Sequence, residues 1–421
     1  MQKLTTMTGT FKTFVLLALL CLNVCVMAQD GKRYRRSSIY SLMINHTNQK
    51  FSEDIRNAFL KIPVPDKYND HNLSVKVVTM DKKLSGASSN EENEKITEFL
   101  DSNLVASRLV AKWFNRDLYT GTCNMNLVKE RGLYDATEFD RQMAERSARG
   151  KAMLEDAGED LIGNTFVLVN DIRYVDKSKA TMWVGIGLSL LSAGAGAAMA
   201  ANGATVSQLN SFNQSTQNLS AMIQNIKGFK VKINTFLYQL VWDDDAAAVF
   251  YEQQYTDVPD EAKRLAFEAA RAGYRLKYVG KVESRASETS YVGVNLYDPQ
   301  AMVRKVCQRA LDENIVDLQT EFEAFRTRTP ILTSEPITAG IGLKEGVNAK
   351  SKFEVLEQIQ EEDGSIIYKR VGVIAPDPNM IWDNRYMAVE EGAPNSLLGK
   401  TTFRHVSGTA PMPGMLIREM E

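Results

Sequence analysis

The sequence is poor in the residues that carry most enzyme chemistry. Among 421 residues there are three histidines and four cysteines. None of the histidines (His46, His71 and His405) stands at helical or short-loop spacing from another histidine, a cysteine or a pair of carboxylates, as a zinc site requires. Motifs for a nucleophilic serine, a zinc-binding histidine pair and a phosphate-binding lysine are also missing. We therefore expect a protein that is not an enzyme and that has no metal or other cofactor.

Charge is missing from one long stretch. Overall 24% of residues are charged, yet the 47 residues from Ala180 to Ile226 include no Asp, Glu, Lys or Arg. Chance does not account for such a run. It requires surroundings that disfavour charge, which are a lipid bilayer, another subunit or the protein's own core.

The two halves of this uncharged stretch differ in pattern. Small residues recur at every fourth position of the first half: Gly185, Ser189, Ala193 and Ala197. On a helix they form one flat stripe that lets another backbone approach closely. In the second half, apolar residues such as Leu209 and Phe212 recur at mostly three-and-four spacing, which predicts an amphipathic helix. We predict a helical hairpin that mediates self-association. The alternatives are a β-hairpin turning at Asn202-Gly203 and a hairpin buried against its own domain.

The first 28 residues are typical of a secretory signal peptide. Lys3 and Lys12 precede an apolar run, and small residues at Val26 and Ala28 suit cleavage. Cleavage removes two lysines and no acid, so the formal net charge becomes −2 − 2 = −4, which does not indicate nucleic-acid binding. Basic residues within 32–36 resist translocation, so an uncleaved anchor is the alternative.

Two cysteines, Cys123 and Cys307, lie outside the predicted signal peptide. In an oxidising compartment they either pair or remain two separate buried thiols. The sequence leaves both possibilities open.

The remainder of the chain predicts an α+β protein. Its apolar periodicity predicts strands at 38–44, 73–79, 125–128, 165–174, 229–242, 246–255 and 275–284, and helices at 51–62, 94–114, 135–157, 260–272 and 301–328. The alternation predicts an α/β layered domain over 29–300 that carries the uncharged hairpin as an insertion. Residues 301–330 are predicted as a long connecting helix. Short glycine-punctuated strands over 331–421, with a hairpin at 353–374, predict a small β-barrel.

Several of these segments together resemble envelope proteins. The run Lys129-Glu130-Arg131-Gly132-Leu133, the following helix, the strand at 166–169 and the paired strands at 231–255 resemble the curli-secretion channel family CsgG and the middle domain of the flagellar protein FlgT. Segment 341–355 and Gly372-Val373-Ile374 resemble the C-terminal barrel of FlgT. The resemblance implies an α/β scaffold that carries membrane-inserted hairpins, although the insertion here lacks the alternation of a barrel strand.

Three smaller features complete the candidate sites. Glu130 and Arg131 are predicted to form a structural ion pair that fixes the loop before a helix. Trp382, Arg385 and Tyr386 are residue types that anchor recognition surfaces, and the alternative is a turn packed by its own aromatic rings. The acidic run 243–245 is interpreted as a tight turn rather than a cation site.

The predicted function is that of a non-enzymatic assembly or scaffold protein of the cell envelope. We expect a homo-oligomer, in the periplasm or outer membrane of a Gram-negative bacterium, that contacts the membrane or an envelope complex and does not bind nucleic acid. The alternative is a secreted or periplasmic hydrolase, which is supported only by the size of the chain and by its expected compartment.

Overall fold

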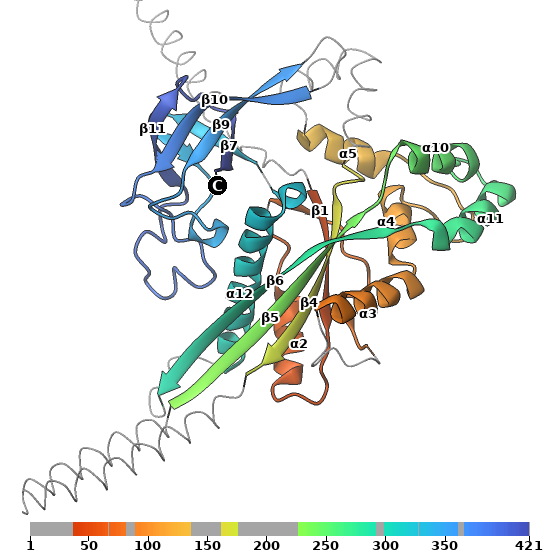
Figure 1. Ribbon diagram of the computed structural model, residues 1–421, viewed down its shortest axis with the longest axis horizontal. Coiled ribbons are helices and arrows are strands. Elements are labelled where there is room, and N and C mark those ends of the chain that lie inside the picture. Colours follow the sequence, from red (N-terminus) through yellow and green to blue (C-terminus); the bar gives the residue numbers. More distant parts are fainter. Residues whose placement is uncertain are drawn as a thin grey trace, which may run out of the picture. The chain divides into compact units, whose positions relative to one another are not determined.

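The computed structural model describes residues 37–65, 67–80, 89–135, 161–175, 226–291, 299–326, 328–360 and 366–420. Two sheets and seven α-helices make up this part of the chain, so the fold is mixed α+β (Figure 1). The predicted signal peptide, nearly all of the predicted helix at 135–157 and all but the last residue of the uncharged stretch lie outside the described residues.

The first sheet has six strands in the order β2-β1-β4-β5-β6, with β3 also paired to β1. The strands are β1 (Ser37–Ile44), β2 (Tyr68–Asp70), β3 (Val77–Val78), β4 (Thr165–Tyr174), β5 (Ile226–Leu240) and β6 (Leu276–Tyr291). The central strand β1 runs parallel to β2, β3 and β4, whereas β5 runs antiparallel to both β4 and β6. The predicted strands at 38–44, 165–174, 229–242 and 275–284 are confirmed, and β5 and β6 extend past the predicted limits.

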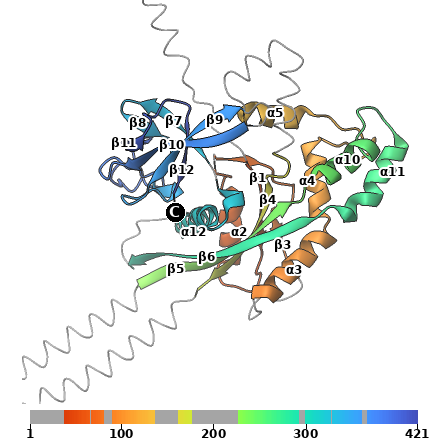
Figure 2. The same cartoon turned by 45° about the horizontal axis from the view of Figure 1, so that its top comes forward.

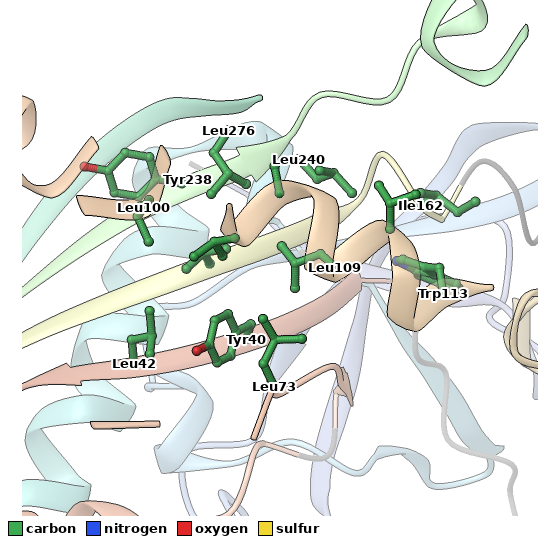
Figure 3. Close-up of a cluster of buried hydrophobic side chains, with 14 of the residues drawn as sticks. Tyr40, Leu42, Leu73, Leu100, Leu109, Trp113, Ile162, Tyr238, Leu240 and Leu276 are labelled. Atoms are coloured by element: carbon green, nitrogen blue, oxygen red, sulfur yellow. The ribbon is translucent and has the colours of Figure 1, made fainter. Parts of the chain in front are cut away.

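Helices cover both faces of this sheet (Figure 2). One face carries α3 (Ser89–Ser102) and α4 (Val105–Trp113), and the other carries α2 (Ser52–Lys61) and α12 (Pro299–Glu321). Successive residues of a strand point to opposite faces, so a strand buried on both sides needs apolar residues throughout. Tyr40 and Leu42 of β1 pack with Trp113 in one core (Figure 3), and Met43 packs with Phe59 in the other.

The C-terminal segment closes on itself. Its strands are β7 (Thr329–Ser334), β8 (Ile337–Ala339), β9 (Phe353–Gln360), β10 (Ile366–Pro376), β11 (Thr401–Gly408) and β12 (Leu416–Glu419). They pair antiparallel in the order β10-β11-β8-β7-β12-β9, and β9 pairs back to β10. The expected small β-barrel thus corresponds to a closed six-stranded ring, which we call the C-terminal ring.

The helix α12 differs from the connecting helix expected at 301–330. Val303 and Val306 pack in the core beside α2, and Leu318 packs against the sheet near its centre, so α12 is a layer of the first domain. The helix ends at Glu321, and the C-terminal ring already begins at Thr329. The apolar face predicted for the helix explains this placement because burying it stabilises the domain.

Several local predictions were wrong. Residues 125–128 lie mainly in α5 (Asn126–Asp135), and residues 246–255 lie mainly in α10 (Asp244–Gln253), so neither is a strand. The acidic run is an N-cap rather than a hairpin turn, because Asp243 Oδ1 accepts from the amide of Ala246 at 2.9 Å. The helix predicted at 94–114 is broken at Leu104, whose φ is 53°. The helix at 260–272 is confirmed as α11 (Glu261–Ala270).

Candidate functional site

The uncharged stretch is rooted between two neighbouring strands. Tyr174, the last residue of β4, pairs antiparallel with Val231 of β5, and the amide of Val175 donates to the carbonyl of Lys230 at 2.8 Å. The chain leaves the described structure after Val175 and re-enters it at Ile226. Because antiparallel neighbours need only a two-residue turn, the fold does not require a long connection at this position.

Beyond this root, β5 continues paired with β6. The ladder runs from Leu240 opposite Leu276 to Ile226 opposite Tyr291, so the β5–β6 ribbon extends past the last residue of β4 (Figure 1). Lys232 of β5 pairs with Glu283 of the edge strand β6 at 2.6 Å, and both side chains are partly exposed. Such charged side chains discourage unwanted pairing at a sheet edge.

Aromatic rings fix the root from the α2 side. Phe51 lies edge-on to Tyr174 at 5.0 Å between ring centroids and to Phe229 at 5.5 Å. Tyr174 and Phe229 stack at 5.6 Å, and Lys50 Nζ lies 5.1 Å from the centroid of Phe51. Aromatic pairs of this geometry add about 0.5–1.5 kcal/mol beyond the burial of their area. The point from which the uncharged stretch departs is therefore held rigidly.

A buried carboxylate lies next to this root. Asp171 of β4, whose side chain is 1% exposed, accepts from Arg173 at 2.8 Å and contacts His46 Nε2. A histidine–aspartate pair is two-thirds of a catalytic triad, but among the described residues no hydroxyl or thiol is hydrogen-bonded to His46. The cluster ties the end of β1 to the end of β4. No group of metal-ligating side chains occurs in the described ranges either.

Arg131 is buried, with 4% of its surface exposed, but Glu130 is not its hydrogen-bond partner. The guanidinium donates to Ser38 Oγ and to His71 Nδ1, both at 2.8 Å, and its centre lies 4.1 Å from the ring centroid of Trp113. Glu130 is exposed, so the predicted ion pair is replaced by hydrogen bonds to residues distant in sequence.

The charges of this buried cluster follow from those contacts. Burial lowers the pKa of Arg131 to about 10, which leaves the guanidinium charged at neutral pH. Burial and the adjacent guanidinium hold the pKa of His71 well below its usual range. A neutral His71 accepts from Arg131 at Nδ1 and donates from Nε2 to the carbonyl of Leu109 at 3.0 Å. The cluster therefore fixes α4 and α5 to the sheet.

Trp382, Arg385 and Tyr386 have partners within the chain. The indole of Trp382 donates to the carbonyl of Ser396 at 3.1 Å, and Arg385 makes two bonds to Asp383 at 2.8 and 2.9 Å. These contacts match the alternative of a segment packed by its own side chains. They lend no support to partner recognition by these residues.

The same segment attaches the C-terminal ring to α12. Arg309 donates to the carbonyl of Tyr386 and to Glu391, both at 3.0 Å, and Arg304 stacks at 4.9 Å from the ring centroid of Tyr386. Glu391 also pairs with Lys305, whose side chain is only 4% exposed. Truncating one partner of such a buried pair leaves an uncompensated charge.

The six uncharged-stretch residues of the self-association prediction, Gly185, Ser189, Ala193, Ala197, Leu209 and Phe212, lie outside the described residues. No helix in the part of the chain that the structure describes is long and apolar enough to cross a membrane. Cys123 and Cys307 are both buried and free, in line with two separate thiols. A scan against protein-family models and a search of curated proteins found no match to the chain.

Proposed function

We propose that this protein is a non-enzymatic assembly or scaffold protein of the cell envelope that self-associates through residues 180–226. The observation that carries the proposal is the position of this stretch. It interrupts the β4–β5 connection at an aromatic-braced root, where the paired strands on either side keep their register.

The composition of the stretch supports a role outside the domain's own core. The sheet below the root is already covered on both faces by helices whose apolar residues are buried. A charge-free stretch of 47 residues then finds matching surroundings most readily in further copies of itself or in a bilayer. The small-residue stripe at Gly185 and Ala193 suits close helix packing between copies.

The cellular setting rests on the N-terminal sequence and on the envelope-protein resemblance. The signal-peptide pattern supports export to the periplasm or outer membrane. The α/β scaffold and the C-terminal ring, which we interpret as a small β-barrel, agree with the arrangement implied by the CsgG and FlgT resemblance. We place the protein in a homo-oligomer that contacts the membrane or a larger envelope complex.

The test compares two variants of the stretch by light scattering after size-exclusion chromatography and by membrane fractionation. One carries Gly185→Leu and Ala193→Leu, and the other replaces Thr181 to Asn225 with a short Gly/Ser bridge. We expect both to fold and to form smaller particles, because bulky side chains separate the packed helices. Ala272→Leu, at an exposed position outside the stretch, serves as the matched control. An unchanged particle size and unchanged membrane association in both variants would show that the proposal is wrong.

A further inference from the structure

A cavity of about 350 Å³ lies where the C-terminal half of α12 meets the C-terminal ring. Its wall combines charged groups, including Lys67 and Glu419, with apolar side chains such as Val316, Phe353 and Ile417. Pockets for small ligands begin at about 300 Å³ and combine an apolar wall with a few polar groups that fix orientation. The size and lining of this cavity fit that description.

Two arginines of the wall are already neutralised from within the chain. Glu323 accepts from Arg326 at 3.0 Å and from Arg418 at 2.6 Å. Arg418 makes a second ion pair with Glu354 at 2.5 Å, and Arg326 also donates to two backbone carbonyls. These guanidinium groups are therefore held in the wall by internal partners and have little capacity left for a ligand.

Lys67 and Glu419 differ from the arginines. Lys67 stands just before β2, and in the described part of the chain no carboxylate lies within ion-pair distance of its ammonium. Burial lowers the pKa of Lys67, and the carboxylates of Glu345 and Glu419 oppose that shift. Burial raises the pKa of Glu419, while a hydrogen bond with Ser351 and the charges of Lys67 and Arg326 oppose that shift. Glu345 also lies in the wall. Opposite charges thus line one space without forming an ion pair with each other, and a ligand that carries both charges could join them.

We propose that this cavity binds a zwitterionic ligand of amino-acid or dipeptide size, whose carboxylate pairs with Lys67 and whose ammonium pairs with Glu419. A simple anion would leave the acidic side of the cavity unpaired, and a simple cation would face the lysine. A ligand that carries both charges satisfies both sides. Its side chain packs on Val316, Phe353 and Ile417, which supply the apolar wall.

The position of the cavity adds a consequence. Lys67 and Val316 belong to the first domain, whereas Glu419 and Phe353 belong to the C-terminal ring. A ligand held between them stabilises the docking of the ring on α12, because binding only to the docked form favours that form by mass action. Saturating ligand should therefore raise the melting temperature of the full chain.

The first experiment changes the ligand and leaves the protein unaltered. Binding of leucine, alanyl-leucine, N-acetyl-leucine, leucinamide and N-acetyl-leucinamide to the full chain is measured by calorimetry and thermal shift. The uncapped compounds are expected to bind at least about tenfold more tightly than any capped compound, which corresponds to about 1.4 kcal/mol. The proposal is overturned if no compound binds at about 10 mM, or if a capped compound binds as well as its zwitterion.

The second experiment changes the two charges of the cavity. Lys67→Met and Glu419→Gln should each weaken binding of the zwitterion by about tenfold or more. Lys350→Met and Glu357→Gln, at exposed positions outside the cavity wall, are the matched controls and should bind as the parent does. Parent-like binding by both cavity variants overturns the assignment. Because the capped ligands test the same charges, the outcome does not depend on the folding of either variant.

Discussion

The carboxyl group of Asp312 should make the free energy of unfolding depend on pH. A single substitution at this position can measure that contribution. Asp312 lies on α12 where the helix meets the C-terminal ring, and its side chain is 11% exposed. Lys344 Nζ is 3.9 Å away, and in the described structure Oδ2 has no hydrogen-bond partner. Burial raises the pKa of Asp312 to about 7, with Glu345 acting in the same direction and with Lys344 and Arg309 opposing it.

The raised pKa of Asp312 determines whether stability rises or falls with pH. Below about pH 4 the carboxyl is protonated in both the folded and the unfolded chain. Between about pH 4 and pH 7 the unfolded chain releases its proton while the folded chain retains it, so the free energy of unfolding falls as pH rises. A shift of about three pKa units at about 1.4 kcal/mol each sets a ceiling of about 4 kcal/mol on this loss. Relaxation around the ionised group reduces it, and we expect about 2–4 kcal/mol.

Asp312→Asn removes the titration and keeps the shape. The variant should match the parent near pH 4 and exceed its free energy of unfolding by about 2–4 kcal/mol at pH 8. Urea unfolding, followed by circular dichroism at both pH values, measures the difference in free energy of unfolding between variant and parent. The titration of other groups, such as His71, is the same in both proteins and cancels. Asp257→Asn, at an exposed position, is the control. A variant that is less stable than the parent at pH 8 would refute the reasoning, since it would mean that the Lys344 contact outweighs burial.

Three further substitutions test the packing described above. Gly280→Ala should lower the free energy of unfolding by about 1–3 kcal/mol, because an added Cβ would lie 2.0 Å from Cζ of Phe322. Glu391→Gln should lower it by about 3–5 kcal/mol, because it leaves the ammonium of Lys305 buried without its carboxylate. Arg131→Ala should lower it by about 1–3 kcal/mol through the loss of hydrogen bonds to buried groups. Urea unfolding at pH 7 measures all three.

Each of these variants has a matched control. Gly273→Ala adds a Cβ with no atom within 4 Å, and Glu390→Gln neutralises an exposed neighbour of Glu391. Glu130→Ala removes the exposed carboxylate beside Arg131 and should be nearly neutral. If Glu130→Ala lowers the free energy of unfolding as much as Arg131→Ala does, the ion pair predicted from the sequence, and not the hydrogen bonds described above, would account for the contribution of Arg131.

The parts of the fold that could be predicted from sequence are those encoded by local periodicity. The long strands β4 and β5 alternate between apolar and polar residues or are continuously apolar. Helix α11 follows Asp260, an acidic residue of the kind preferred at the N-cap, and its side chain caps the helix. The same logic failed at Asp243, because an acidic residue before a run of alanines fits both a turn and an N-cap. The high helix propensity of the alanines at 246–248 decides in favour of the helix.

The candidate sites depend on contacts that no local pattern contains. The hydrogen-bond partner of Arg131, His71, lies 60 residues away in the chain, whereas Glu130 is only its sequence neighbour. The cavity joins Lys67, before β2, to Glu419, at the end of β12. Sequence spacing carries no signal for such a meeting. A lysine that precedes a short strand looks like any surface lysine until the tertiary structure encloses it.

The place of β12 in the C-terminal ring determines when that ring becomes safe from aggregation. β12 lies between β7 and β9, so the ring closes only after residues 416–419 have left the ribosome. Until then β7 and β9 are the two open edges of a five-stranded sheet, and open edges recruit strands from other chains. A premature stop codon before Leu416 would leave this vulnerable sheet as the final product. Cellular quality control would then have to remove a chain that lacks β12 and is prone to strand pairing with other chains.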